Sequence, residues 1–218
     1  MGYGVIFDLD GVLIDSSLLH LESWRIVGQE RGFEMSEELF WRTFGMPNRQ
    51  IFALLFGRPL PEEQADELSE YKESVYRKLA AGRLRPLPGA VELLHALRRD
   101  GFKVALGSST PRSNVQVILD TIGIRHCFNA VVTGNDVTHG KPHPEVFLKA
   151  AERLQLPPAR CVVVEDAVVG VDAARAAGMR CLAVTTTHPR EKLAHADRVV
   201  DCLTEVSAND LRELLAQE

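Results

Sequence analysis

The sequence has no closely spaced cysteine pair. Its four cysteines, Cys127, Cys161, Cys181 and Cys202, lie far apart, and none belongs to a CxxC motif. Cys161 and Cys181 each begin an apolar run, a position typical of buried thiols rather than of disulfides. This use of cysteine predicts a protein of the reducing cytoplasm.

Long hydrophobic runs are missing as well. No apolar stretch is long enough to span a bilayer. The first expected strand begins so close to Met1 that no room is left for the charged and apolar regions of a signal peptide. Ile6 stands where a myristoylation signal needs serine or threonine. We therefore expect no membrane segment, no leader and no lipid anchor.

Runs of like-sign charge, internal repeats and low-complexity segments are also absent. The net charge of −5 is spread along the 218 residues, which argues against nucleic acid as the main partner. A chain of this length, with 45% hydrophobic residues, can form one large domain or two smaller ones around a proper core.

Beyond residue 85, short β-branched runs alternate with longer helical patterns. The expected strands are residues 3–8, 103–109, 130–136, 161–167 and 181–187, with a weaker one at 198–200. The expected helices are residues 89–101, 113–123, 144–156 and 168–178, several of which end at a glycine. Near-continuous apolar strands separated by helices are typical of a parallel sheet covered on both faces. The pattern predicts a doubly wound α/β fold.

The segment 16–84 interrupts this alternation. It has a helical pattern without a convincing strand, and its aromatic clusters "FWRTF" and "IFALLF" suit a small separate core. An ordinary connection after a strand is only a few residues long. We therefore expect residues 16–84 to form an inserted α-helical cap domain, and residues 1–15 and 85–218 to form the core domain. The hinges are expected near Asp15–Ser16 and in "GRLRPLPG" at 82–89.

Polar side chains follow several of the expected strands. Asp8 and Asp10 follow the first strand, and alternation along a strand directs both to one face while Leu9 points away. Two such carboxylates need a cation, a shared proton or a function to compensate their repulsion. The carboxyl ends of parallel strands meet at one edge, where open α/β sheets bind ligands. The residues expected at this edge are Asp8, Asp10, Ser108, Ser109, Asn135, Asp136, Glu165 and Asp166.

These side chains suit phosphoryl chemistry. The four acids Asp8, Asp10, Glu165 and Asp166 make a hard oxygen cluster that fits Mg²⁺. Lys141, just before a helix in "HGKPHPE", and Ser108 can hold an anion beside it. Each feature has a plainer explanation: an Asp-Gly turn, a serine N-cap or turn at Ser108, a solvated Lys141, or acids that complement a helix N-terminus.

Four motifs in order resemble those of the haloacid dehalogenase superfamily, in the subgroup with a helical cap after the first motif. "DLDGV" is similar to the first motif, "LGSS" to the second, "KPHPE" to the third and "VVEDA" to the fourth. The resemblance covers essentially all 218 residues, and among the closest likenesses are β-phosphoglucomutases and sugar-phosphate phosphatases. It implies a Rossmann-like core with an inserted cap.

The resemblance also implies roles for the core residues. Asp8 corresponds to the nucleophile that becomes an aspartyl phosphate, and Asp10 to the general acid/base. Glu165 and Asp166 correspond to Mg²⁺ ligands, joined by Asp8 and the backbone carbonyl of Asp10. Ser108 and Lys141 correspond to the groups that bind the phosphoryl oxygens.

The cap residues bear on the substrate. His20 has a counterpart in β-phosphoglucomutases, Arg49 resembles a cap arginine that binds a distal phosphate, and Lys72 resembles a cap lysine near the substrate. For each, a solvent-facing helix residue is an equal alternative. The tryptophans Trp24 and Trp41 are expected to pack the cap rather than stack on a sugar. His139 and His143 are interpreted as loop histidines outside the catalytic set.

The expected function is Mg²⁺-dependent hydrolysis of a small phosphosugar or related metabolite. The alternative is a β-phosphoglucomutase that passes the phosphoryl group to a sugar hydroxyl. Ser16, where threonine is usual, and Ala167, where serine is common, weigh against the mutase. A dehalogenase needs neither the acid at position 10 nor a metal, and a non-catalytic binding protein would be expected to lack Asp8 or the Glu165–Asp166 pair. We expect a cytoplasmic monomer with no nucleic-acid or membrane partner.

Overall fold

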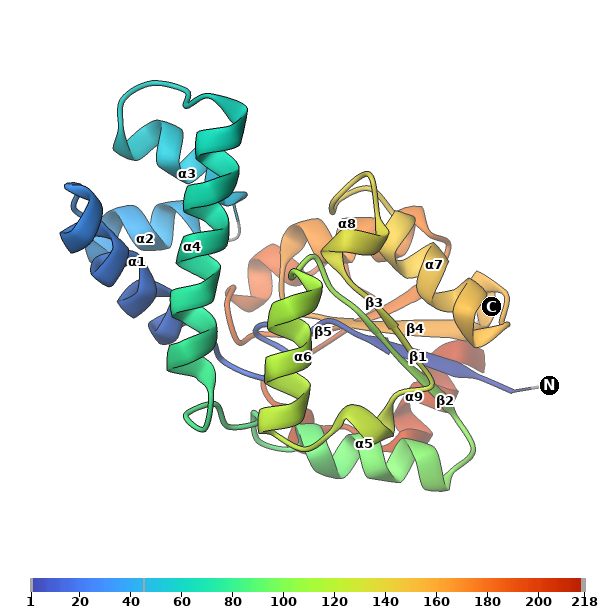
Figure 1. Ribbon diagram of the computed structural model, residues 1–218. Helices are drawn as coiled ribbons and strands as arrows, with labels where there is room; N and C mark the ends of the chain where they lie inside the picture. The colour runs from blue at the N-terminus through green and yellow to red at the C-terminus, as the bar shows by residue number, and fades with distance from the viewer. Residues whose placement is uncertain (1, 45, 217–218) are drawn as a thin grey trace. The chain divides into compact units, whose positions relative to one another are not determined.

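A computed structural model describes residues 2–44 and 46–216 of the chain (Figure 1). By its internal contacts the chain divides into two compact units. The first unit comprises Met1–Asp15 and Arg85–Glu218, and the second comprises Ser16–Leu84.

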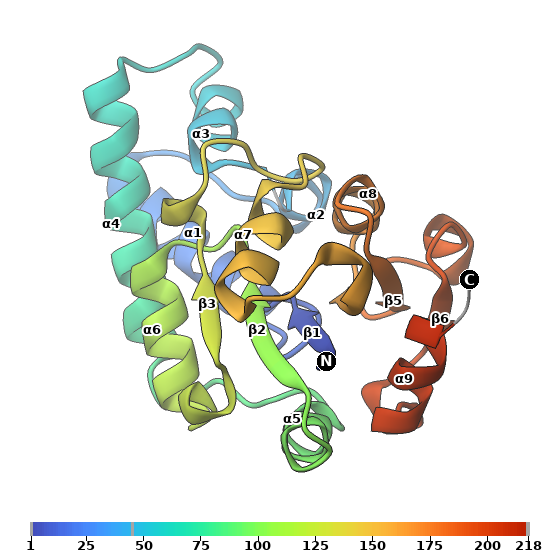
Figure 2. The same ribbon diagram turned by 90° about the vertical axis from the view of Figure 1, so that its right-hand side faces the viewer.

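A parallel sheet of six strands is the centre of the first unit, in the order β3-β2-β1-β4-β5-β6 (Figure 2). The strands are β1 (Gly4–Phe7), β2 (Lys103–Gly107), β3 (Ala130–Val132), β4 (Cys161–Glu165), β5 (Arg180–Val184) and β6 (Arg198–Val200). In the centre of the sheet Phe7 pairs in register with Leu106 on one side and Val164 on the other. The residues that follow β1 and β4 therefore leave the sheet side by side.

Helices cover both faces of this sheet (Figure 1). The α-helices of this unit are α5 (Ala90–Arg99), α6 (Arg112–Thr121), α7 (Glu145–Leu154), α8 (Val168–Ala176) and α9 (Ala208–Ala216). Short 3₁₀ turns are η1 (Arg125–Cys127), η2 (Gly134–Asp136), η3 (Pro158–Arg160), η4 (Arg190–Leu193) and η5 (Leu203–Glu205). Helices α7 and α8 pack on one face, and α5 and α9 pack on the other.

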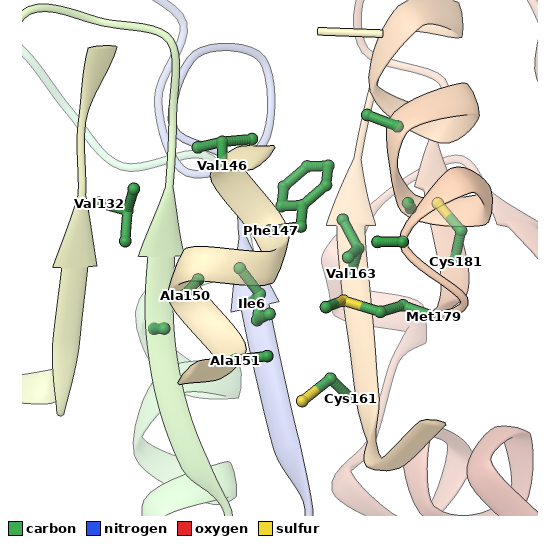
Figure 3. Packing of buried hydrophobic residues seen from close by; sticks show 14 of the residues in the cluster. Ile6, Val132, Val146, Phe147, Ala150, Ala151, Cys161, Val163, Met179 and Cys181 are labelled. Carbon is green, nitrogen blue, oxygen red and sulfur yellow. The ribbon is translucent and has the colours of Figure 1, made fainter. Parts of the chain in front are cut away.

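A large hydrophobic cluster lies between the sheet and helices α7 and α8 (Figure 3). Phe147 of α7 is completely buried in this cluster, together with Ile6 of β1 and Val163 of β4. The thiols of Cys161 and Cys181 are buried there as well, as the sequence predicts. Because this packing removes both central strands from water, it holds their carboxyl ends in fixed positions.

The second unit is helical. It consists of α1 (Ser17–Arg31), α2 (Glu37–Thr43), α3 (Asn48–Leu55) and α4 (Glu62–Ala80). Trp24 and Phe52 pack edge to face in its small core, with ring centroids 4.9 Å apart. Both tryptophans pack within this unit as expected: Trp24 is buried, and Trp41, although 47% exposed, lies edge to face against Phe40 and Phe44, with ring centroids 5.2 and 5.7 Å apart. Trp41 neighbours buried Phe40 on α2, and consecutive residues of a helix point in different directions.

The doubly wound α/β fold predicted from the sequence is confirmed. Four strands end two to four residues earlier than expected, at 107, 132, 165 and 184, because the polar residues that follow turn out of the sheet. Helix α9 was not predicted. No helix in the described part of the chain is both long and apolar enough to cross a membrane.

Candidate active site

Two carboxylates and one ammonium meet where β1 and β4 end. The Lys141 Nζ lies 2.5 Å from Asp8 Oδ1 and 2.6 Å from Glu165 Oε1. All three side chains are at least nine-tenths buried. Asp8 also donates its backbone N–H to the Val164 carbonyl, which ties the end of β1 to β4. The structure thus brings together residues from three of the predicted motifs.

Glu165 is held by the chain that follows it. Its Oε2 accepts hydrogen bonds from the backbone N–H groups of Asp166 (2.8 Å) and Ala167 (2.9 Å). A Cβ atom at Gly170 of α8 would overlap the Glu165 carboxyl group. Glycine at position 170 therefore lets this helix approach the buried carboxylate closely.

Gly11 makes room for Asp166. Its backbone has φ +81°, a conformation that L side chains rarely adopt, and a Cβ atom there would overlap the Asp166 carboxylate. The Asp-Gly pair of the first motif therefore forms a turn. It also leaves a space into which an acid from the fourth motif fits.

Asp10 is oriented by a hydroxyl that the sequence analysis missed. The Thr110 Oγ1 donates to Asp10 Oδ2 at 2.6 Å. The Thr110 backbone N–H in turn donates to the buried Ser108 Oγ at 3.1 Å. Ser108 therefore makes a local serine turn, one of the plainer explanations of this residue, at the position expected for a phosphoryl-binding group. The signal for Thr110 was its place two residues after Ser108 in the same polar loop.

The acids carry more negative charge than Lys141 neutralises. Burial raises the pKa of Asp8 to about 7; Lys141 opposes this shift, and the charge of Glu165 adds to it. Burial also raises the pKa of Asp166 well above its ordinary value, helped by Glu165 and Asp8. Burial disfavours the Lys141 ammonium, but the attraction of Asp8 and Glu165 outweighs it, so the pKa of Lys141 is raised.

The negative charge that Lys141 leaves uncompensated, together with the chemistry of the donor atoms, shows whether a divalent cation fits this site. The donors are carboxylate oxygens, which are the ligands that Mg²⁺ prefers. A dication would favour the ionised forms of Asp8 and Asp166, which burial and mutual repulsion otherwise disfavour. The donor set therefore fits Mg²⁺.

The helical unit has a buried polar cluster of its own. The Lys72 Nζ on α4 lies 2.7 Å from His20 Nδ1 on α1 and 2.9 Å from Glu73 Oε1. The His20 ring stacks on Tyr76, with ring centroids 3.9 Å apart. Asn48 donates to the same Glu73 oxygen at 2.8 Å. Lys72 is therefore not a solvent-facing residue, and Glu73 is a member of the cluster that the sequence analysis missed.

Arg49 lies in a different environment. Its guanidinium is about half exposed and pairs with Asp66 (2.5 Å) and with Glu62 (3.3 Å), both on α4. Such exposed pairs hold a side chain weakly. Arg49 would have to leave these partners in order to bind a phosphate.

The loop histidines lie outside the acid cluster. His139 and His143 are exposed, and their ring centroids are 4.7 Å apart. Glu145, at the start of α7, accepts from the His139 backbone N–H at 2.9 Å and from Lys149 at 2.7 Å. The His143 Nδ1 accepts from the Glu145 backbone N–H at 3.3 Å. These contacts hold the loop that carries Lys141 against the start of α7.

The comparison with protein families agrees with this arrangement. The family model described as haloacid dehalogenase-like hydrolase matches residues 4–178, which include all four motifs. The chain belongs to the haloacid dehalogenase-like hydrolase family. The family resemblance noted in the sequence is thereby confirmed.

Relatives of this haloacid dehalogenase-like hydrolase include phosphatases. It is 33% identical over 216 residues to a phosphorylated carbohydrates phosphatase of Thermotoga maritima, covering 97% of this chain and 99% of that protein. It is 34% identical over 213 residues to a chloroplastic 5-amino-6-(5-phospho-D-ribitylamino)uracil phosphatase of Arabidopsis thaliana, covering 97% of this chain. The chain spans 57% of that plant protein's length.

A solved structure has the same fold. The crystal structure of a β-phosphoglucomutase from Clostridium difficile is similar to this hydrolase with a TM-score of 0.86 and 27% identity. The match covers 99% of this chain and 98% of the other. With its family and its relatives established, the protein is an enzyme.

Proposed function

We propose that this enzyme is a Mg²⁺-dependent phosphatase that hydrolyses small phosphosugars or related phosphorylated metabolites through an aspartyl phosphate. The observation that carries the proposal is Lys141, whose ammonium bridges Asp8 and Glu165 in a buried, acid-rich site at the ends of β1 and β4. The Thermotoga relative, which acts on phosphorylated carbohydrates by its name, supports the substrate class.

In the proposed reaction Asp8 is the nucleophile. Its carboxylate attacks phosphorus and forms an aspartyl phosphate, while the bond from phosphorus to the substrate oxygen breaks. Lys141 already contacts Asp8 Oδ1, so its ammonium lies where negative charge on the phosphoryl oxygens can be neutralised. Ser108, buried in the neighbouring loop, supplies a hydroxyl to the same oxygens.

Asp10 is the proposed proton carrier. In its acid form it protonates the departing substrate oxygen, and in its base form it then takes a proton from the water that attacks the aspartyl phosphate. The Thr110 hydroxyl donates to one Asp10 oxygen at 2.6 Å and so fixes the orientation of the carboxyl group for this transfer. Thr110 is thus a positioning residue in the proposal.

Asp8, Glu165, Asp166 and the Asp10 backbone carbonyl would hold Mg²⁺. When bound, the ion neutralises charge on the phosphoryl group and on the carboxylates around it. The protein's contribution is to fix these ligands: Glu165 by two backbone N–H groups, and Asp166 by the space that Gly11 leaves.

An Asp8→Asn variant tests the nucleophile. It keeps the shape of the side chain but removes the attacking charge, so we expect phosphate release from small phosphosugars with Mg²⁺ to fall by about 10³-fold or more. The matched control is Asp120→Asn, an exposed aspartate of α6, which should retain activity. Chelation of the metal should silence the wild type. Near-normal turnover by Asp8→Asn would refute the aspartyl phosphate.

A β-phosphoglucomutase is the second candidate. The buried Lys72 with His20 in the helical unit favours it, as does the similarity to the Clostridium difficile mutase. A mutase needs a cation for the phosphate that is not reacting, and Arg49 and Lys72 are the candidates. The pairs of Arg49 with Asp66 and Glu62, together with Ser16 and Ala167, incline the proposal to hydrolysis.

The two candidates differ in the acceptor. We supply β-glucose 1-phosphate with a trace of glucose 1,6-bisphosphate and follow both glucose 6-phosphate and free phosphate. The phosphatase releases phosphate with little isomerisation. Rapid isomerisation with little phosphate would establish the mutase, and Arg49→Ala should then reduce isomerisation far more than residual hydrolysis.

A further inference from the structure

A second cluster of ligand atoms lies away from the acid site. His95 of α5 and the consecutive residues His126 and Cys127 of η1 hold their ring nitrogens and sulfur within 4.8 Å of one another. Both histidines are exposed, whereas Cys127 is buried. The cluster therefore joins a buried sulfur to two imidazoles at the surface.

The cluster lies at the opposite end of the sheet from Asp8. Helix α5 leads into β2, and η1 comes just before β3, so both segments are at the amino ends of their strands. Asp8 and Glu165 lie at or beyond the carboxyl ends of β1 and β4. These two strands run parallel to β2 and β3. The cluster is therefore separate from the proposed magnesium site.

The spacing of two of its atoms fits a tetrahedral metal centre. The Cys127 Sγ and the His126 Nε2 are 3.6 Å apart. Bonds of about 2.3 Å from zinc to sulfur and about 2.1 Å from zinc to nitrogen, at a tetrahedral angle, place these ligand atoms about 3.6 Å apart. The separation of these two atoms is therefore the one that a tetrahedral zinc ion bound to both of them requires.

His95 is placed to supply a third ligand. Its ring centroid is 6.0 Å from that of His126, with an angle of 37° between the ring planes. Because His95 is exposed on a helix surface, a rotation of its side chain can shorten the distance to the ion. The Arg98 Nη1, one helical turn along, donates to the Cys127 carbonyl at 3.0 Å and so fixes η1 against α5.

The other histidine cluster is less suitable. His139 and His143 lie near Glu145, but both oxygens of that carboxylate already accept hydrogen bonds from backbone N–H groups or from Lys149. That cluster offers two imidazoles and a carboxylate whose oxygens already accept hydrogen bonds. The cluster at η1 offers two imidazoles and a sulfur.

We propose that His95, His126 and Cys127 bind one Zn²⁺ ion, or another borderline ion such as Co²⁺, with water as the fourth ligand. Sulfur and imidazole ligands favour such ions over Mg²⁺, so magnesium at the acid site does not compete. The ion joins α5 to η1. It thereby stabilises the amino ends of β2 and β3, and this holds whether or not the enzyme is a phosphatase.

Cobalt provides the decisive measurement, because thiolate ligation gives a sulfur-to-cobalt charge-transfer band in the near ultraviolet. We titrate the reduced full-length protein with Co²⁺ in excess Mg²⁺ and expect this band to saturate at one equivalent. Zn²⁺ should then displace the cobalt and abolish the band. If no such band forms, the proposal is wrong.

Variants locate the site. Cys127→Ser should abolish the band, and the exposed-site variants His126→Gln and His95→Gln, which leave the core unchanged, should each weaken binding at least about tenfold. The controls are Cys202→Ser, at a cysteine that belongs to neither cluster, and His143→Gln, in the other cluster. Loss of the band in either control, or its persistence at full affinity in His126→Gln and His95→Gln, would overturn the assignment.

Discussion

At the scale of single residues, glycine decides the shape of the acid site. Gly11 has φ +81° and leaves the space that the Asp166 carboxylate occupies. Gly101, between α5 and β2, has nearly the same backbone conformation, φ +80°, but a Cβ atom there would meet nothing within 4 Å. An alanine at Gly101 would therefore strain only the backbone. An alanine at Gly11 would strain the backbone and also displace the Asp166 carboxylate.

We predict that Gly11→Ala and Gly101→Ala differ in activity far more than in stability. The positive φ alone should cost each variant about 1 kcal/mol in the free energy of unfolding, because alanine is strained there. Only Gly11→Ala should move Asp166. The turnover of this variant should therefore fall at least about tenfold, and the Mg²⁺ concentration that gives half-maximal activity should rise. Denaturant unfolding and metal-dependent phosphate release check both. Equal activities would show that Asp166 does not need this space.

Hydrogen-bond donors at the site also act residue by residue. Asp10 depends on the Thr110 hydroxyl, and Glu165 depends on two backbone N–H groups of its own loop. Each contact fixes one carboxylate oxygen, and the other Glu165 oxygen pairs with Lys141. A site in which one acid binds a cation and another exchanges a proton needs carboxylates held in this way.

At the scale of elements, helices α1 and α4 are joined by a buried polar cluster. Burial and then the Lys72 ammonium together lower the pKa of His20 to about 3, against the opposing charge of Glu73. Burial opposes ionisation of Glu73, but Lys72 and His20 outweigh it and bring its pKa to about 2. At neutral pH the cluster therefore holds a neutral imidazole between Lys72 and the stacked Tyr76 ring.

We predict that mild acid destabilises the helical unit through His20. Its pKa is depressed on folding, so the unfolded chain binds a proton below about pH 6.5 that the folded unit does not accept. From about pH 7.5 to about pH 5 the free energy of unfolding should fall by about 2 kcal/mol. Glu73 stays ionised over this range and adds nothing. His20→Gln should remove the loss, while the exposed His143→Gln should retain it.

The two tryptophans provide the readout. Trp24 and Trp41 are the protein's only tryptophans, and both belong to the unit Ser16–Leu84, so their fluorescence follows the unfolding of that unit. Denaturant titrations at the two pH values give the free energies. An equal acid loss in wild type and His20→Gln would assign the sensitivity to another group.

At the scale of the whole molecule, the chain forms two compact units with separate hydrophobic cores. The chain passes between them twice, at residues 15–16 and 84–85. Two connections of this kind permit one unit to move as a body relative to the other. We propose on this ground that residues 16–84 act as a lid.

We predict that the lid changes position when a phosphate analogue and Mg²⁺ bind together. Closure would exclude bulk water from the aspartyl phosphate, and opening would release the product. Small-angle scattering with and without both ligands should give a smaller radius of gyration for the ligated enzyme. The radius of gyration of Asp8→Asn with the phosphate analogue but without Mg²⁺ serves as the reference. A lid that docks away from Asp8 in every state would refute this role.

The sequence by itself determined the fold class and the positions of the acids along it. Apolar β-branched runs between amphipathic helices leave few alternatives to a covered parallel sheet, and residues that follow such strands must lie at one edge. Family motifs added roles to Asp8, Asp10, Glu165 and Asp166 that composition alone would not assign. These features are local or periodic, so they can be read from the chain.

Only the tertiary structure decided which partners these residues have. Thr110 contacts Asp10 across a large separation in sequence, Glu73 joins Lys72 and His20 inside a helix pair, and Trp41 remains exposed beside buried Phe40. The cluster of His95 with His126 and Cys127 likewise exists only because α5 packs against η1. Such contacts depend on the packing of distant segments, for which a single sequence carries no periodic or local signal.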